Sequence, residues 1–204
     1  SPITGNKSKF TYEELRSKVS KFAGALKAQG ANKGDRVIIY MPMIPEAVVA
    51  MLACARIGAI HSVVFGGFAS NELASRIDDS KAKLLVTASC GFEPGRTVEY
   101  KPLVNEAIKI ANHKIDKMIL FQRPGNEVKL NAPNEVSWEE VVSDAKDIDC
   151  VEMSSNEFAY ILYTSGTTGT PKGIVRDIGG HIVALKWTMK NIYNIDTDDI
   201  WWSA

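Results

Sequence analysis

Apolar residues recur along this chain at alternating strand and helix spacings. Thr11 and Glu14 form a capping-box pattern, and apolar residues then follow at intervals of three and four until Gly30. We expect further helices at 45–59, 70–80, 100–112, 137–145 and 181–193, and strands at 35–42, 61–67, 82–89, 116–123 and 158–164. We place a side-chain cap at Ser70 or Asn71, and a turn at 179–180. The alternation predicts an α/β fold, with a mostly parallel sheet and helices on both faces.

The composition of the chain limits the classes of partner that it could bind. The chain has 204 residues, 45% of them hydrophobic, and its 24 basic residues balance its 24 acidic ones. No global charge therefore favours nucleic acid or an anionic membrane surface. Cys54, Cys90 and Cys150 are odd in number and widely spaced, which indicates neither a disulfide framework nor a zinc site. We expect a reducing intracellular compartment, either the mitochondrial matrix or the cytoplasm, with no membrane span.

The most informative stretch is "YILYTSGTTGTPKG", residues 160–173, where an apolar strand runs into hydroxyls, glycines and one lysine. Glycines let backbone N–H groups approach a ligand, the hydroxyls add donors, and the lysine adds a positive charge. Such a loop, without a carboxylate, suits a nucleotide polyphosphate, although a solvated turn has a similar composition. The candidate phosphate-binding residues are Thr164, Ser165, Gly166, Thr167, Thr168, Gly169, Thr170 and Lys172.

Two common nucleotide motifs do not fit this loop. A Walker loop places its lysine before Ser or Thr at the start of a helix, whereas Lys172 lies between Pro171 and Gly173. Pro171 removes a donor and biases Thr170 towards an extended conformation, so Lys172 follows a stiffened turn. No Rossmann glycine pattern follows the first strand.

The segment "YTSGTTGTPKG" resembles the phosphate-binding signature of the adenylate-forming enzymes. The segment "ARIGAIHSVVFGGFASNELASRIDDSKAKLLVTA" resembles the acetyl-CoA synthetase branch. "CGFEPGRTVEYKPLVNEAI" is most similar to the propionyl-CoA synthetase (short-chain acyl-CoA synthetase) subgroup. This resemblance implies an AMP-forming synthetase that converts propionate or acetate with ATP, Mg²⁺ and coenzyme A into a thioester. The loop at 164–173 would then hold the β- and γ-phosphates of ATP.

The same resemblance implies a coenzyme A loop at Glu93, Pro94, Gly95 and Arg96. In the acetyl-CoA synthetase branch this loop carries two arginines that contact the phosphorylated nucleotide end of the coenzyme. Here Glu93 stands in place of the first arginine, and only Arg96 remains. The alternative is that Arg96 forms an ordinary surface ion pair.

The resemblance also implies that residues 1–204 are an incomplete N-terminal domain. In the family the adenine and acyl pockets and a carboxy-terminal domain with its catalytic lysine follow the phosphate loop. We therefore assign no catalytic residue and expect no activity from this chain alone. Two alternatives remain open, namely an aryl-acid or amino-acid activating enzyme and a non-catalytic nucleotide- or partner-binding module.

Several other residues attract attention without forming a catalytic pattern. His61, His113 and His181 have no partner carboxylate at an informative spacing, and we expect His61 to be a hydrogen-bonded core or strand-end residue. Cys54 is expected to be a small buried residue. Three tryptophans could line an acyl pocket, but core packing is the expected role of Trp187, Trp201 and Trp202.

Overall fold

The computed structural model of this chain describes residues 5–164 and 171–202. The helices within these residues are α1 (Tyr12–Ala28), α2 (Pro45–Ile57), α3 (Ser70–Ser80), α4 (Tyr100–Ile110), α5 (Trp138–Asp144) and α6 (Ile178–Asn191). The strands are β1 (Arg36–Met41), β2 (Ile60–Phe65), β3 (Leu84–Ala88), β4 (Cys90–Glu93), β5 (Arg96–Glu99), β6 (Lys117–Phe121), β7 (Glu135–Ser137), β8 (Phe158–Thr164) and β9 (Lys172–Asp177). Each helix and strand expected from the pattern is present, with ends shifted by a few residues.

Within the described residues, seven strands form the main sheet in the order β7-β6-β3-β1-β2-β8-β9. Every neighbouring pair is parallel except β8 and β9, which are antiparallel. β4 and β5 form a separate antiparallel hairpin. The prediction of a mostly parallel sheet is therefore confirmed, and the carboxyl ends of β1, β2, β3 and β6 share one edge.

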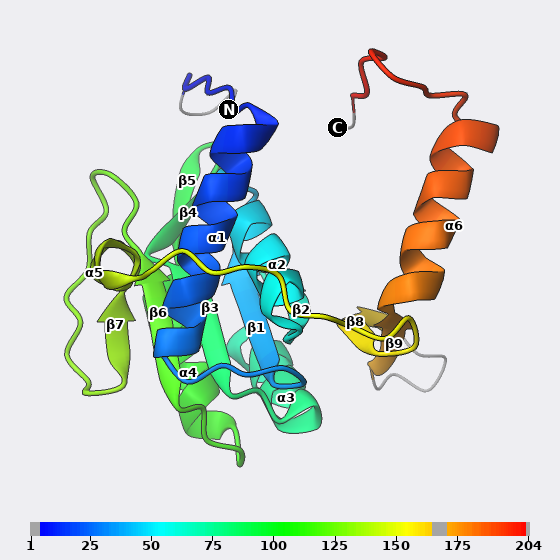
Figure 1. Ribbon diagram of the computed structural model, residues 1–204. Helices are drawn as coiled ribbons and strands as arrows, with labels where there is room; N and C mark the ends of the chain where they lie inside the picture. Colours follow the sequence, from blue (N-terminus) through cyan, green and yellow to red (C-terminus); the bar gives the residue numbers. More distant parts are fainter. Residues whose placement is uncertain (1–4, 165–170, 203–204) are drawn as a thin grey trace.

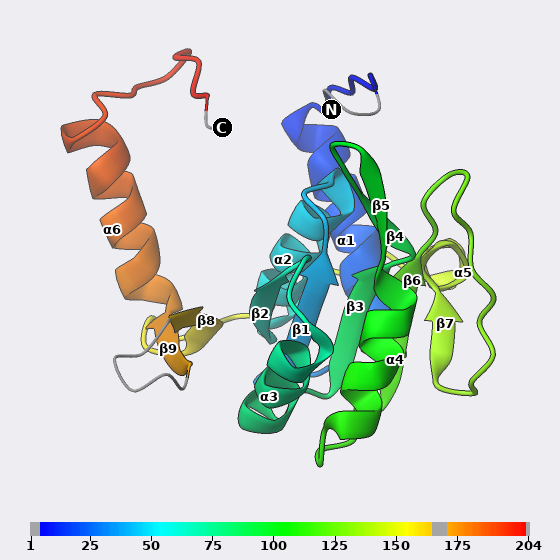
Figure 2. The same cartoon turned by 180° about the vertical axis from the view of Figure 1, so that it is seen from behind.

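The central strands are buried on both faces. In β1, Val37 and Ile39 pack into a core formed with α1, α2 and α5. Ile38 and Tyr40, which point the other way, pack into a second core with α3 and α4. The two views show these helix sets on opposite sides of the sheet (Figures 1 and 2). Helices thus cover both faces, as the continuous apolar runs predict.

Local capping explains where the helices begin and end. α1 has the expected capping box, in which the Glu14 N–H donates to Thr11 Oγ1 at 3.1 Å and the Thr11 N–H donates to Glu14 Oε2 at 2.7 Å. α2 ends at Gly58, which adopts the left-handed conformation with φ of 68°. The cap expected at Ser70 or Asn71 is wrong, because Ala69 is the N-cap of α3 and makes no side-chain hydrogen bond.

The expected turn at 179–180 is also wrong. Asp177 caps α6 by accepting a hydrogen bond from the backbone N–H of Gly180, so both glycines lie in the first helical turn. α6 stands apart from the other helices in both views (Figures 1 and 2), and none of its residues is buried.

This exposure corrects the packing role expected of the tryptophans. Trp187 is 58% exposed, Trp201 47% and Trp202 79%. In the described part of the chain, no helix combines the length and the apolar character that a membrane crossing requires.

Candidate functional site

The phosphate-loop residues lie at the end of an antiparallel hairpin. Thr164, the last residue of β8, pairs in register with Lys172, the first residue of β9. The predicted loop residues Ser165, Gly166, Thr167, Thr168, Gly169 and Thr170 lie outside the described residues. Lys172 is exposed and forms no ion pair within the described ranges, so its charge is available to a ligand.

β8 is joined to the body of the sheet through β2, its parallel neighbour. It pairs with β2 at His61 and Tyr160. Closer to the loop, the Tyr163 hydroxyl donates to Asp79 Oδ2 at 2.6 Å, and the guanidinium of Arg76 lies 5.2 Å from the centre of the Tyr163 ring. These contacts to α3 fix the end of the strand that leads into Thr164.

The predicted coenzyme loop is a tight hairpin turn between β4 and β5, two strands that the apolar pattern does not reveal. Glu93 pairs with Arg96 across the turn, and Gly95 has a φ of 76°. Proline followed by a positive-φ glycine is typical of a type II turn. Glu93 Oε2 accepts a hydrogen bond from Arg96 Nε at 2.7 Å and forms an ion pair with Arg96 Nη2 at 2.6 Å.

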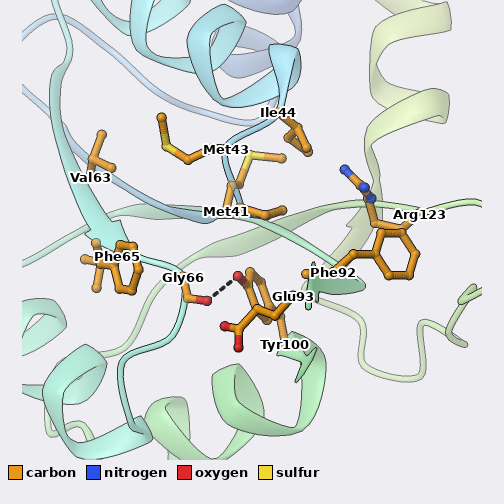
Figure 3. Close-up of a pocket in the computed structure, with 13 residues that line it drawn as sticks. Met41, Met43, Ile44, Val63, Phe65, Gly66, Phe92, Glu93, Tyr100 and Arg123 are labelled. Atoms are coloured by element: carbon orange, nitrogen blue, oxygen red, sulfur yellow. Dashed lines mark hydrogen bonds between the residues drawn. The ribbon is translucent and has the colours of Figure 1, made fainter. Parts of the chain in front are cut away.

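A pocket of about 380 Å³ opens beside this turn. It lies at the carboxyl ends of β1 and β2, where open α/β sheets usually bind ligands. Figure 3 shows Met43 and Phe65 near its apolar part, Glu93 next to Tyr100, and Arg123 beside Phe92. The pocket therefore combines apolar walls with one carboxylate and one guanidinium.

Tyr100 closes the floor of this pocket. Its hydroxyl donates to the backbone carbonyl of Gly66, and its ring packs 5.0 Å from that of Tyr40. Burial raises the pKa of Tyr100 to about 12, so its hydroxyl stays protonated at neutral pH. Gly91 lies against the same ring, where an added Cβ would meet the Tyr100 hydroxyl oxygen at 2.6 Å. These contacts favour glycine at position 91.

The three histidines contact aromatic rings or hydrogen-bonding groups. The rings of His61 and Tyr160 stack with centroids 5.5 Å apart, and Tyr160 contacts His181 through its hydroxyl, 3.3 Å from Nδ1. The expectation that His61 is fully hydrogen-bonded is wrong, because its buried Nδ1 lacks a partner among the described residues. Burial, and to a smaller extent the charge of His181, lowers the pKa of His61 to about 4. His113 Nε2 lies 2.9 Å from the carbonyl oxygen of Ala82.

The cysteines and the possible metal ligands of the described residues were also considered as candidate catalytic groups. Cys54 is completely buried, and burial raises the pKa of its thiol to about 12, which makes it a poor nucleophile. Cys54, Cys90 and Cys150 are all free thiols. Across residues 5–164 and 171–202, no group of three or more His, Cys, Asp or Glu side chains is arranged to hold a metal ion.

Among the described residues, neither Thr164 nor Lys172 lines the pocket beside Glu93. The pocket beside Glu93 has no lining residue from β8 or β9. Lys172 lies in β9, the strand at one end of the main sheet, whereas β6 lies near the other end. Sequence reasoning also missed Arg123, which follows β6 and lines the pocket. Its available signal was its place as the last residue of the strand predicted at 116–123.

The comparisons with known proteins place this arrangement in a family. Residues 2–204 match the family described as "AMP-binding enzyme". Because the match spans nearly the whole chain, the protein belongs to the family of AMP-binding enzymes.

Individual relatives are consistent with this membership. The chain is 55% identical over 205 residues to acyl-CoA synthetase short-chain family member 3, mitochondrial, of Homo sapiens, covering all of this chain and 30% of that protein. It is 44% identical over 196 residues to acetyl-coenzyme A synthetase of Shewanella frigidimarina, covering 95% and 30% of the two chains. The solved acetoacetyl-CoA synthetase from Streptomyces lividans superposes with a TM-score of 0.87 at 27% identity, covering 97% of this chain and 30% of that one. The chain thus spans about 30% of the length of the relatives that it matches.

Proposed function

We propose that this chain is part of an ATP-dependent, AMP-forming synthetase that activates propionate or acetate and transfers the acyl group to coenzyme A. The observation that carries the proposal is the 55% identity to a short-chain acyl-CoA synthetase along the whole chain. In the first step a carboxylate oxygen attacks the α-phosphorus of ATP, which gives an acyl-adenylate and pyrophosphate. In the second step the coenzyme thiolate attacks the acyl carbon, and AMP leaves.

In this scheme the β8–β9 hairpin binds the β- and γ-phosphates. Lys172 and Thr164 stand opposite each other at its base, so an ammonium and a hydroxyl flank the entrance to the loop. The charge of Lys172 is exposed and has no ion-pair partner in the described ranges, which suits a polyphosphate, because catalysis of phosphate displacement depends on positioning and on neutralising oxygen charges. We propose the same role for Ser165, Gly166, Thr167, Thr168, Gly169 and Thr170. Mg²⁺ would arrive with ATP, and we assign no residue to it.

The turn at Glu93, Pro94, Gly95 and Arg96, with the pocket beside it, is proposed to receive the nucleotide end of coenzyme A. The pocket offers an aromatic and aliphatic wall for a base and a guanidinium for a phosphate. By analogy with the mitochondrial relative, we propose that the protein acts in the mitochondrial matrix.

Pyrophosphate exchange tests this function. A longer protein that contains this chain should exchange labelled pyrophosphate into ATP only when a short carboxylic acid is present, and the ratio of kcat/KM for propionate and acetate should identify the preferred acid. The 204-residue chain alone should show no exchange, because it supplies a phosphate loop and part of a coenzyme site. Exchange that depends on an amino acid or an aryl acid, but not on propionate or acetate, would contradict the proposal.

A further inference from the structure

Two guanidinium groups lie near the pocket beside the β4–β5 turn, and they differ in their surroundings. Arg96 directs Nε and Nη2, the edge that binds oxyanions in a bidentate manner, at Glu93 Oε2. The side chain of Arg96 is 71% exposed at the tip of the turn. A phosphate would have to displace both the carboxylate and the hydration shell from this group.

Arg123 is held in place before any ligand arrives. Its backbone N–H donates to Ser89 Oγ at 2.9 Å, and its carbonyl accepts from the N–H of Asn126 at 3.0 Å. The guanidinium carbon lies 5.0 Å from the centre of the Phe92 ring, so the ring supports one face of the guanidinium. This stacking leaves the donors in the guanidinium plane free to bind an anion.

The Nε donor of Arg123 has no acceptor among the described residues. This Nε is buried, and the guanidinium forms no ion pair in the part of the chain that the structure describes. A buried donor without an acceptor is unfavourable, and a bound oxyanion would satisfy it. An ion pair in such a partly dry position is also stronger than one in water.

The one carboxylate that lines the pocket does not oppose this role. Glu93 also faces the pocket, but its ion pair with Arg96 balances its charge. The turn therefore contributes no net charge, and Arg123 supplies the positive charge of the pocket.

From these observations we infer that Arg123, and not Arg96, is the residue of this chain that binds a phosphate group of the coenzyme. The inference rests on the proposed function, because it takes the pocket to be the site of the nucleotide end of coenzyme A. It makes Arg123 a specificity-determining residue for a phosphorylated ligand, while the Glu93–Arg96 pair keeps the turn neutral.

The test is an NMR titration of the isotope-labelled chain with coenzyme A and, separately, with adenosine 3′,5′-bisphosphate and inorganic phosphate. We expect the Nε–Hε resonance of Arg123 to shift and saturate with both nucleotides, while that of Arg96 stays in place. Inorganic phosphate should shift the Arg123 resonance only at higher concentration, because it lacks the contacts of the adenosine with the apolar wall. A saturating shift at Arg96 with none at Arg123 would overturn the inference.

Matched substitutions provide the second readout. Arg123→Gln should weaken nucleotide binding about tenfold, which is the loss expected for one charge-assisted hydrogen-bonded pair. The double variant Glu93→Gln with Arg96→Gln removes the other guanidinium without changing the net charge of the turn, and it should weaken nucleotide binding less than Arg123→Gln does. The reverse order of effects would overturn the inference, and because the titration uses the wild-type chain, an unfolded variant would not prevent the test.

The outcomes separate this inference from the proposed function. If neither nucleotide binds to the chain, the inference is wrong, whereas acid-dependent pyrophosphate exchange by the longer protein would still support the function. If the nucleotides bind at Arg123 but the longer protein forms no thioester, the inference stands and the proposed function is wrong.

Discussion

A buried ion pair between α4 and β7 gives a sharp prediction about stability. Lys101 Nζ donates to Glu135 Oε2 at 2.9 Å, and the two side chains are only 9% and 7% exposed. The same carboxylate oxygen accepts from the backbone N–H groups of Asn131 at 2.7 Å and Ala132 at 3.3 Å. Replacing Lys101 with Met would leave the carboxylate buried without its countercharge.

The magnitude follows from these contacts. Removing one partner of a buried ion pair costs about 3–5 kcal/mol. Glu135 keeps two backbone donors, which places Lys101→Met near the lower end, at about 3 kcal/mol in the free energy of unfolding. In a chain of this size the midpoint of thermal unfolding should then fall by about 6–12 °C.

The pH dependence has a definite sign. Burial alone would raise the pKa of Glu135, but the hydrogen bonds from Lys101 and from the backbone N–H groups of Asn131 and Ala132 outweigh it, so the folded-state pKa lies below the usual 4.5. The stability that the carboxylate contributes is complete above pH 4.5 and is lost as the pH falls through the lower folded-state value. The difference between the wild type and Lys101→Met should therefore shrink in acid.

Urea unfolding at pH 7 and in acid measures this difference. Lys109→Met is the matched control on the same helix, because Lys109 Nζ lies 3.8 Å from Glu106 Oε2 and its side chain is 75% exposed. The control should cost less than about 0.5 kcal/mol. Equal effects of the two substitutions at pH 7 would refute the reasoning.

Three further predictions concern residues near the candidate sites. Tyr163→Phe removes the hydrogen bond to Asp79 at the end of β8 and should lower the free energy of unfolding by about 1 kcal/mol in urea; an unchanged value would argue against this anchor. Gly91→Ala places a Cβ 2.6 Å from the Tyr100 hydroxyl oxygen and should cost about 1–3 kcal/mol in the same assay, whereas a neutral result would contradict the close packing. The pKa of His61 is lowered from 6.5 to about 4, so the free energy of unfolding of the wild type should decrease as the pH falls from 6.5 to 4, because the unfolded chain binds the extra proton. His61→Gln should flatten this slope, and an identical slope in the variant would count against the burial of His61.

The main helices and strands could be predicted because the order of apolar and polar residues shows which of their faces are buried. Val37 to Met41 form an unbroken apolar run because both faces of β1 are covered, and Thr11 with Glu14 marks the start of α1. β4 and β5 were missed because strands of four residues carry too few alternations to reveal a period. The Pro94–Gly95 dipeptide was the available signal.

The phosphate-binding loop could be predicted from the sequence, whereas the pocket beside Glu93 could not. The hydroxyl-rich loop is visible locally, since its residues are consecutive, whereas the pocket is formed by residues that are distant in sequence. Arg123 becomes a candidate only after the fold places it beside Phe92. The Glu93–Arg96 pair also required the structure, because the hairpin turn brings the two side chains together.

The central claim is that the base of the β8–β9 hairpin positions the phosphates of ATP through Lys172. Its most direct test is acid-dependent pyrophosphate exchange by a protein that contains this chain and carries Lys172→Met, with the exposed Lys190→Met as the control. We predict that Lys172→Met lowers the exchange rate by about a hundredfold, the effect typical of losing one charge-stabilising group, while Lys190→Met leaves it unchanged. An exchange rate for Lys172→Met equal to that of the control would contradict the claim.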